Sequence, residues 1–530
     1  MKASQTMDPV VSLCRCRSVL RPTLAVLCFL VGCGKSTEAP AAKPETPAVV
    51  QVAASDAPTA NADGPKPDAP ASDPLAASTE PGFDWPCFLG PDHNCVSKET
   101  GLLETWPQEG PPLVWSKKVG EGHGAPSVLG QRLVLHHYEQ RKEVVECFHA
   151  LTGESLWTHK YPSSFRDPYG YNNGPRCSPI LTPQYCYTFG AEGVLLCLKL
   201  ATGEVVWKRE TQQDFTVPEG FFGVGSSPLL WGDKLIVMVG GQPNSGVVAF
   251  DVRTGKTLWE SVGKSTWDGV KTGWPSPKNY EWTGEEMVVS YSSPIPAVIH
   301  GHKHVLCLMR HGLVSVDPDT GAERFKYWFR SRVHESVNAA SPVVLNDTVL
   351  ISSEYRTGSA LLKVQPDGNS FDVVWRNPRG LESHWATAIH AQDAFFGFSG
   401  HYEPEGRMTC IDAQTGGVKW ESPGFDSPLD RYERTSEDEV VDRKTRESLL
   451  YPIFGRGSLT MADGKFIVMG ERGGLMALMN PNPEKRDEIV GCRAPKLGYP
   501  TWAGPVVSRG RLYLRSQDWL ICLDLRRAKQ

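Results

Sequence analysis

The sequence predicts an all-β fold, an eight-bladed β-propeller, because two features recur at a spacing that suits four short strands per unit. The first is Thr-Gly-x-x-x-Trp, at 152–157, 202–207, 254–259 and 415–420, with Phe for Trp at 320–325 and a looser copy at 367–375. The second is a small residue, usually followed by Pro, that opens an apolar run. It occurs at 125–126, 178–179, 227–228, 293–294, 341–342 and 504–505, and without Pro at 387–388 and 458–459. Together these marks define eight units.

Each unit has the strand and turn signals of a four-stranded meander. In the third unit, short apolar runs at 228–231, 234–240, 246–251 and 257–259 are separated by Gly-Asp and Thr-Gly turns. The glycine after the threonine supplies the positive φ of a tight turn, and the Trp can pack one blade on the next. The predicted docking residues are Trp115, Trp157, Trp207, Trp259, Phe325, Trp375 and Trp420, with Ile489 as the eighth.

The first of these docking positions has no blade before it. We therefore predict that the strand at 113–115 closes the ring by completing the last blade, whose other strands come from 502–525. Such closure removes the exposed edges that an open sheet would leave.

These units resemble the Trp-docking repeats of the PQQ-like (pyrroloquinoline-quinone-type) eight-bladed propellers, over roughly residues 83–525. Asp84-Trp85-Pro86 and Gly90-Pro91 also resemble the entry segment of uncharacterised PQQ-binding-like lipoproteins of planctomycete type. The resemblance implies the fold of the quinoprotein alcohol dehydrogenases. Because the family also includes the propeller lipoprotein of the outer-membrane barrel-assembly machinery, the resemblance does not separate an enzyme from a scaffold.

The N-terminal region is predicted to contain an export signal followed by a tether. Residues 1–33 contain three arginines, a short apolar run and Leu30-Val31-Gly32-Cys33, which resembles a lipobox that would place a lipid on Cys33. An ordinary secretory signal is the alternative. Residues 34–82 contain nine Pro, thirteen Ala and no aromatic residue, a composition typical of a disordered linker. The propeller is then expected over 83–528, as a monomer held at the periplasmic side of a membrane of the cell envelope.

Charge, cysteine content and two insertions give further predictions about partners, covalent links and surface loops. The net charge of −5 gives no basic balance that would favour nucleic acid. Cys87 and Cys95 lie in the exported lead-in and are candidates for a disulfide. No adjacent Cys-Cys pair occurs, although such a pair is frequent in the quinoprotein dehydrogenases. Two insertions, 260–290 and 421–452, are expected to cover one and the same face, the first as an aromatic flap.

A candidate ligand site lies where the innermost strands begin, since these strands converge on the channel of a propeller. Polar, cationic and aromatic residues are unusual at such positions. The candidates are His123, Arg176, Tyr291, Glu335, Asn338, Tyr355, His384, Trp385, Arg456, Glu471, Arg472, Trp502 and Arg515. Arginines at the mouth would suit an anionic or planar ligand. The alternative is that these groups satisfy one another around a water-filled channel.

The leading interpretation is a binding or assembly scaffold for a protein or ligand at the cell envelope. The first alternative is a dehydrogenase using PQQ and Ca²⁺, for which Glu335, Asn338 and Trp385 or Trp502 would imitate part of the site implied by the resemblance. No Asp stands among the mouth positions, so no catalytic residue is assigned. A carbohydrate-binding propeller, suggested by the Trp-rich insertion, is the second alternative. The sequence contains no metal or nucleophile motif, and the alternating histidines at 300–304 fall at a predicted turn.

Overall fold

The computed structural model describes residues 74–78, 80–107, 109–218, 220, 222–269, 271–272, 280–281, 290–333, 336–402, 405–423, 432–434, 440–447 and 454–527. All of them belong to one compact unit, 68–530. The predicted signal peptide with Cys33, and the tether as far as residue 73, lie outside the described residues.

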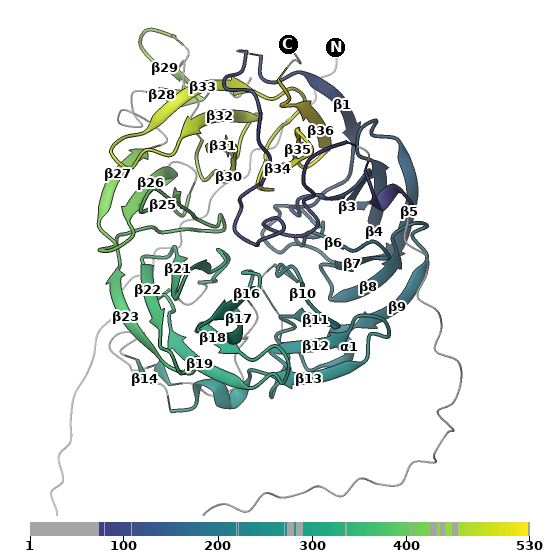
Figure 1. Cartoon of the computed structure of the whole chain (residues 1–530), viewed down its shortest axis with the longest axis vertical. Coiled ribbons are helices and arrows are strands. Elements are labelled where there is room, and N and C mark those ends of the chain that lie inside the picture. Colours follow the sequence, from purple (N-terminus) through teal and green to yellow (C-terminus); the bar gives the residue numbers. More distant parts are fainter. Residues whose placement is uncertain are drawn as a thin grey trace, which may run out of the picture. The chain divides into compact units, whose positions relative to one another are not determined.

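Eight four-stranded antiparallel sheets form a ring (Figure 1), which confirms the predicted eight-bladed propeller. Blade 1 consists of β2 (Ser127–Leu129), β3 (Arg132–Glu139), β4 (Lys142–His149) and β5 (Ser155–Pro162), and blade 2 of β6 (Ile180–Leu181), β7 (Tyr185–Phe189), β8 (Val194–Lys199) and β9 (Val205–Glu210). Blade 3 consists of β10 (Leu229–Trp231), β11 (Lys234–Val237), β12 (Val247–Asp251) and β13 (Thr257–Ser261). Blade 4 consists of β16 (Ile295–Ile299), β17 (His302–Met309), β18 (Gly312–Val316) and β19 (Glu323–Trp328).

Blade 5 consists of β20 (Val343–Leu345), β21 (Thr348–Ser353), β22 (Gly358–Val364) and β23 (Phe371–Asn377), and blade 6 of β24 (Ile389–Ala391), β25 (Ala394–Ser399), β26 (Arg407–Asp412) and β27 (Val418–Pro423). Blade 7 consists of β30 (Ser458–Ala462), β31 (Lys465–Met469), β32 (Leu475–Asn480) and β33 (Asp487–Arg493). Blade 8 combines β34 (Val506–Ser508), β35 (Arg511–Arg515) and β36 (Trp519–Asp524) with β1 (Leu113–Lys118). First strands of neighbouring blades, such as β2 and β6 or β30 and β34, lie against each other around the channel. Short helical turns occur at η1 (Pro74–Ala76), α1 (Thr211–Asp214) and η2 (Lys264–Trp267).

The ring closes as predicted. β1 pairs antiparallel with β36, so the last blade joins the two ends of the described chain. Trp115 on β1 then donates from its indole Nε1 to the carbonyl oxygen of Ala150 in blade 1, at 2.9 Å. The closing strand therefore docks on the next blade in the same way as the others do.

The repeated motif is explained by a contact between neighbouring blades. Five tryptophans each pack on the glycine of the Thr-Gly turn in the next blade, and each indole donates to a carbonyl beside that turn: Trp115, Trp157, Trp207, Trp259 and Trp375. Trp420 donates to Asn482, in a blade without a Thr-Gly turn. Trp157, for example, lies over Gly203 and donates to Leu200 at 2.8 Å. A Cβ on Gly203 would lie 2.5 Å from the ring, so only glycine fits there. Phe325 instead packs on Phe371, where no such Gly contact forms.

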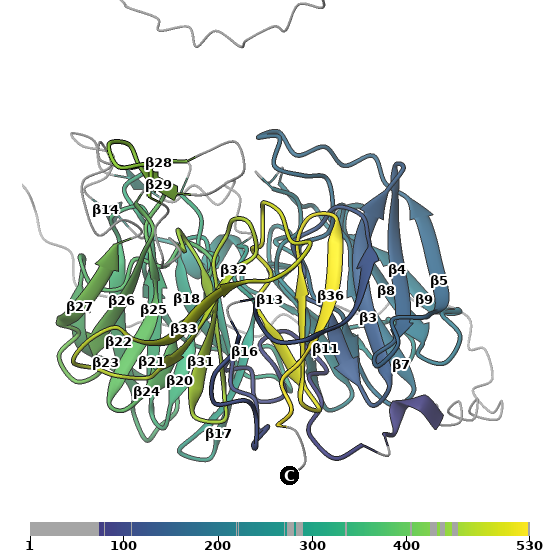
Figure 2. The ribbon, with the colours of Figure 1, turned by 90° about the horizontal axis from the view of Figure 1, so that it is seen from above.

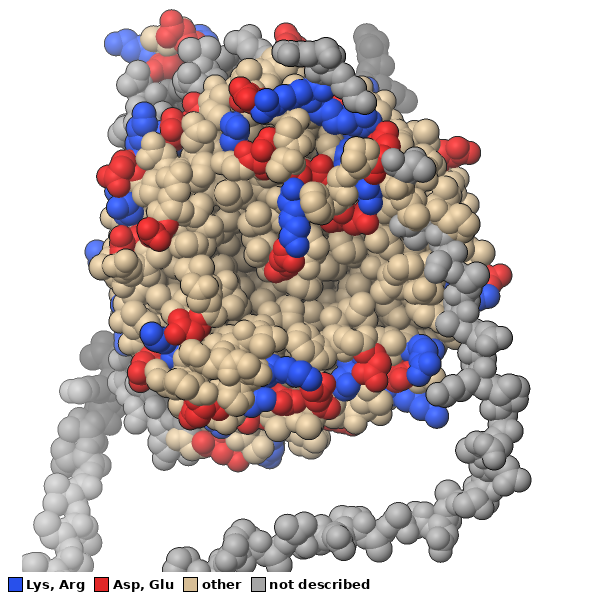
Figure 3. Space-filling view, viewed as in Figure 1, with Lys and Arg blue, Asp and Glu red and all other residues tan. Residues whose placement is uncertain are grey.

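The lead-in segment plugs one end of the channel. Trp85 pairs with β2, the carbonyl of Cys95 accepts from the N–H of Met461 on β30, and Leu89 packs into apolar clusters of blades 4–5 and 6–7. Residues 83–97, which we call the plug, thus touch the ring on several sides and run across its centre (Figure 1). The face they cover carries the hairpins between first and second strands, and we call it the plug face. Acidic and basic side chains are interspersed on it (Figure 3).

Contacts with the propeller begin before residue 83, the predicted boundary. The carbonyl of Leu75 accepts from the backbone N–H of Gln131, in the turn between β2 and β3, at 2.8 Å. The carbonyl of Ala77 accepts from the side-chain amide of the same glutamine at 3.4 Å. Residues 75 and 77 thus add contacts to the plug face of blade 1.

The predicted disulfide between Cys87 and Cys95 is not formed. Both cysteines are unpaired and buried, Cys87 in the apolar cluster between blades 2 and 3 and Cys95 in that between blades 6 and 7. Burial raises the pKa of each thiol to about 12. The two thiols thus fill different interblade cores, which is the usual role of a buried free cysteine.

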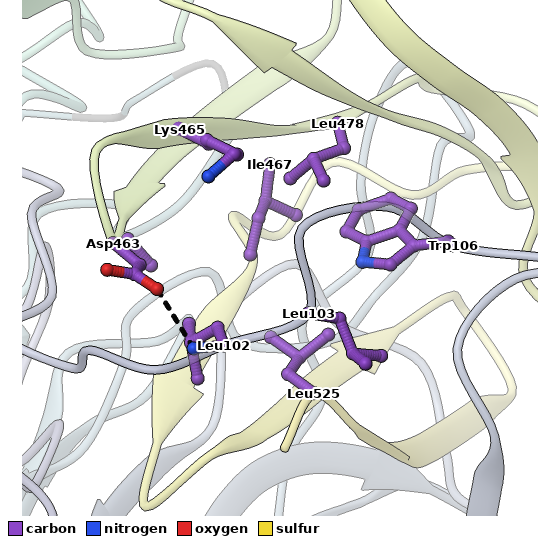
Figure 4. A pocket seen from close by; sticks show the side chains of 9 residues that line it. Leu102, Leu103, Trp106, Asp463, Lys465, Ile467, Leu478 and Leu525 are labelled. Carbon is purple, nitrogen blue, oxygen red and sulfur yellow. Dashed lines mark hydrogen bonds between the residues drawn. The ribbon is translucent and has the colours of Figure 1, made fainter. Parts of the chain in front are cut away.

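A small pocket remains beneath the lead-in (Figure 4), where Leu102, Leu103 and Trp106 face Ile467 and Leu478 of blade 7. The backbone N–H of Leu102 donates to the carboxylate of Asp463 at 2.9 Å. These contacts fasten the lead-in to the hairpin between β30 and β31.

The described parts of the two insertions project from the face opposite the plug (Figure 2). They include two hairpins, β14 (Lys271–Thr272) with β15 (Tyr280–Glu281) and β28 (Tyr432–Arg434) with β29 (Val440–Asp442). Trp267, expected in an aromatic flap, is 1% exposed and packs edge-on against Trp328. It is a core residue, whereas Trp274 and Trp282 lie outside the described residues. No described helix has the length and apolar character needed to span a membrane.

Candidate functional site: the channel mouth

The other end of the channel lies opposite the plug. Two kinds of connection meet there: the loops that enter each first strand, and the turns between second and third strands. We call this side the mouth face. Because both kinds of connection carry polar and aromatic residues, the mouth face gathers side chains from many blades.

An arginine–glutamate pair forms the centre of the site. Arg456, just before β30, donates from Nε and Nη2 to the two oxygens of Glu471, at 3.2 and 2.9 Å. The carboxylate also accepts from the backbone N–H of Arg456 at 2.9 Å and from the indole of Trp502 at 2.9 Å. The side chain of Glu471 is 1% exposed, so this buried charge is balanced by four hydrogen bonds.

Aromatic rings surround this pair. The guanidinium of Arg456 lies 4.6 Å from the ring centre of Trp385 and 5.8 Å from that of Trp502. The two tryptophans are 5.2 Å apart, and His123 lies 4.7 Å from Trp502 on another side. Two polar atoms in this group are buried without a hydrogen-bond partner among the described residues, Nε1 of Trp385 and Nε2 of His123.

A second polar group lies beside the first and contains two histidines. His401 places Nδ1 at 2.7 Å from a carboxylate oxygen of Glu354, and its ring stacks on His384 at 5.0 Å. His384 reaches the hydroxyl of Tyr355 at 3.3 Å and Nη1 of Arg456 at 3.4 Å. Burial, with Arg456 and His401 nearby, lowers the pKa of His384 to about 3. Its imidazole is therefore neutral at physiological pH.

Three predicted site residues are engaged in holding the fold. Asn338 donates from its amide nitrogen to the carbonyls of Met309, Arg310 and Phe329. Arg515 is 2% exposed and donates to the carbonyls of Gly120, Gly124 and Ser516. Arg176 pairs with buried Asp167 at 2.9 Å. These three side chains tie mouth loops together, in agreement with the alternative of mutual satisfaction.

Exposed tyrosines form the rim of the mouth. Tyr169, Tyr171, Tyr402 and Tyr499 are 54, 46, 62 and 39% exposed. Ring contacts connect them to the centre: Tyr171 meets Trp502 at 5.3 Å, Tyr499 meets Trp502 at 5.9 Å, and Tyr402 meets His401 at 4.2 Å. Phe222 joins Tyr169 to Tyr291, at 5.0 and 5.4 Å. The rim is thus a connected set of rings that mostly carry a polar tip.

Sequence reasoning therefore selected part of the site. His123, Tyr355, His384, Trp385, Arg456, Glu471 and Trp502 form one connected group, with Tyr291 and Arg472 at its rim. Glu335 lies outside the described residues. The prediction missed Tyr171, Glu354, His401, Tyr402 and Tyr499. Extending the search to every turn between second and third strands, and to the long loop at 163–179, would have found most of them.

The described residues do not fit a PQQ and calcium site. Such a site needs converging carboxylate and amide oxygens, a carboxylate base, and an open tryptophan face. Glu471 is bound to Arg456, Asp167 to Arg176, and the amide of Asn338 holds backbone carbonyls. No three His, Cys, Asp or Glu residues in the described part of the chain could hold a metal ion together. Arg456 already occupies a position over Trp385, so we derive no redox step.

Comparisons with known proteins agree with the fold. The family described as "Outer membrane protein assembly factor BamB" matches residues 78–262 and 243–450. Quinohemoprotein alcohol dehydrogenase from Comamonas testosteroni is 13% identical, with a TM-score of 0.54 over 86% of this chain and 82% of that chain. A europium-containing methanol dehydrogenase is 12% identical, with a TM-score of 0.53 over 83% and 90%.

BamB from Moraxella catarrhalis is 16% identical, with a TM-score of 0.46 over 79% of this chain and 98% of that chain. No curated protein matches the sequence. At their identities the two dehydrogenase structures show a shared fold only.

Proposed function

Because the chain belongs to the family of the outer membrane protein assembly factor BamB, whose repeats match residues 78–450, we propose that it is an exported lipoprotein scaffold of the cell envelope. The propeller would be anchored through a lipid on Cys33 and would bind its target at the mouth face. Residues 34–82 would be the tether between the lipid and the propeller.

The exposed, connected rim of tyrosines carries this proposal. Large aromatic side chains left exposed and in contact usually mark an interaction surface. Four of the five largely exposed aromatic residues in the described part of the chain lie on the mouth face, and the fifth, Phe83, lies on the plug face. Beneath the rim, the carboxylates of Glu471, Asp167 and Glu354 are each paired with a basic side chain. That arrangement favours binding over acid–base or redox chemistry.

Photo-crosslinking in living cells tests the binding face. A photoreactive amino acid would replace Tyr402 on the mouth face and, as a matched control, Val205 on the outer strand β9, which is 45% exposed. We expect a specific macromolecular adduct from position 402 and none from position 205. Equal labelling at both positions, or no adduct at 402, would reject the mouth face as the binding surface.

Lipidation is tested separately. Cys33→Ser should abolish incorporation of a labelled fatty acid and release the protein from the membrane fraction, whereas Cys87→Ser should leave both unchanged. Continued labelling of the Cys33→Ser variant would contradict the anchor.

A further inference from the structure

We propose that the mouth binds an uncharged saccharide chain. This inference rests on the proposed function, since it names the class of ligand that the mouth face takes. It starts from the connected aromatic rings at the mouth and from two buried polar atoms beside them without a hydrogen-bond partner among the described residues, Nε1 of Trp385 and Nε2 of His123, whose rings both contact Trp502.

Buried polar groups in folded proteins are nearly always hydrogen-bonded, so two orphans around one exposed aromatic cluster need an explanation. The Trp385 indole can only donate, and Nδ1 of His123 accepts from the side-chain amide nitrogen of Asn172 at 3.4 Å, which leaves Nε2 of the neutral imidazole as a second donor. His123 is neutral because burial, with Arg176 and Arg515 nearby, holds its pKa well below the usual value. The oxygen of a hydroxyl group can accept from such N–H donors without bringing a charge to the site.

A third polar atom points to the same ligand class. The Nδ1 of His401 lies 2.7 Å from a carboxylate oxygen of Glu354, which can only accept, so Nδ1 carries a proton and the ring is held in one orientation. His401 is fixed further by its stack on His384 and by Tyr355 at 4.8 Å. The mouth therefore holds hydrogen-bonding atoms in rigid positions, which is how a small number of polar groups gives a site its specificity.

The rings supply the other half of the recognition. A pyranose has an apolar C–H face and a rim of hydroxyls, and Tyr171, Trp502 and Tyr499 present aromatic faces and edges in one connected group. The exposed side chains of this group are tyrosines, whose apolar ring and polar tip suit such a ligand. Exposed aliphatic residues lie mostly on the outer strands, as at Val205, Val373 and Val418.

Charge at the mouth argues for an uncharged chain. Arg456 is neutralised by Glu471, Arg176 by Asp167, and His123 and His384 carry no charge at neutral pH. An anionic ligand would have to compete with buried carboxylates for these arginines. Hydrolysis of the chain is not implied, because neither Glu354 nor Glu471 is a free acid: each is held by a basic partner.

Titration calorimetry with three neutral oligosaccharides, cellohexaose, chitohexaose and maltohexaose, tests the inference on the full-length protein in a detergent without a sugar head group. We expect one or more to bind one-to-one, with an affinity that is insensitive to salt. Tyr171→Ala should weaken binding about tenfold or more by removing a stacking ring. Trp385→Phe keeps the ring and removes only the N–H, so it should weaken binding about three- to tenfold. Phe83→Ala on the plug face is the matched control and should change nothing.

The outcomes separate the two proposals. Absence of binding by all three sugars, with the crosslink at position 402 still formed, overturns the saccharide inference and leaves the scaffold in place with a protein as its target. Sugar binding that neither Tyr171→Ala nor Trp385→Phe weakens places the sugar elsewhere and also overturns it. Loss of the crosslink at 402 when the best sugar is added supports both proposals.

Discussion

Replacing Gly203 by alanine would place a methyl group against the ring of Trp157. Gly203 has φ +74°, and its Cβ would lie 2.5 Å from Cε3 of that ring. Gly232, in the turn between β10 and β11, has φ +57° and would meet no atom within 4 Å. Both substitutions carry the cost of an L-residue at positive φ, about 1–2 kcal/mol. Their difference therefore isolates the overlap with Trp157, for which overpacking typically costs about 1–3 kcal/mol.

Differential scanning calorimetry can detect this difference. Unfolding entropy is about 2.1 cal/mol/K per residue, so a domain of about 450 residues has about 0.9 kcal/mol/K. Gly203→Ala should then melt about 1–3 °C below Gly232→Ala. In the background of Trp157→Ala the difference should disappear, because the ring that the methyl group meets is gone. Equal melting temperatures for the two single variants, or a difference that persists without Trp157, would refute the idea that the Trp–Gly contact explains the repeat.

The remaining predictions concern charged groups. Although burial opposes ionisation of Glu143, hydrogen bonds from His136, Tyr161 and a backbone N–H lower its pKa below 4.5. The ionised carboxylate thus stabilises the fold above pH 4.5, and this contribution is lost as the pH falls through the lowered pKa. Glu143→Gln should therefore reduce the fall in melting temperature that the protein shows as the pH is lowered. Arg515→Met should leave three carbonyls unpartnered and raise amide exchange in β1 and the loop after it, measured by mass spectrometry. His384, with a pKa of about 3, should show the ¹⁵N shifts of a neutral imidazole at pH 5.

The blades were predictable because their determinants repeat along the chain. Each docking Trp and the glycine it covers belong to neighbouring units, so Trp157 and Gly203 mark the fold without any long-range information. Closure followed from one strand, β1, that had no blade of its own. The turn residues and the Trp–Gly contact between neighbouring blades were therefore sufficient to predict the number of blades and the closure of the ring.

The plug and the details of the mouth were not predictable in the same way. Leu89, His93 and Cys95 adopt positive φ although none is glycine, so no turn signal marks their conformation. Cys87 and Cys95 are close in sequence but are separated because each is drawn into a different interblade core. At the mouth, the pairing of Tyr171 with Trp502 depends on loops from blades that only ring closure brings together.

The two faces of the propeller differ in which parts of the chain cover them. Leu75 and Ala77 contact the hairpin of blade 1, and near the C-terminus Arg527 donates to the carbonyl of Leu102, so both ends of the described chain lie on the plug face. Because the plug closes the channel there, a ligand can reach Trp385 and Trp502 only from the mouth face. Deleting the plug is therefore the change that should give a ligand a second route to these rings, from the plug face.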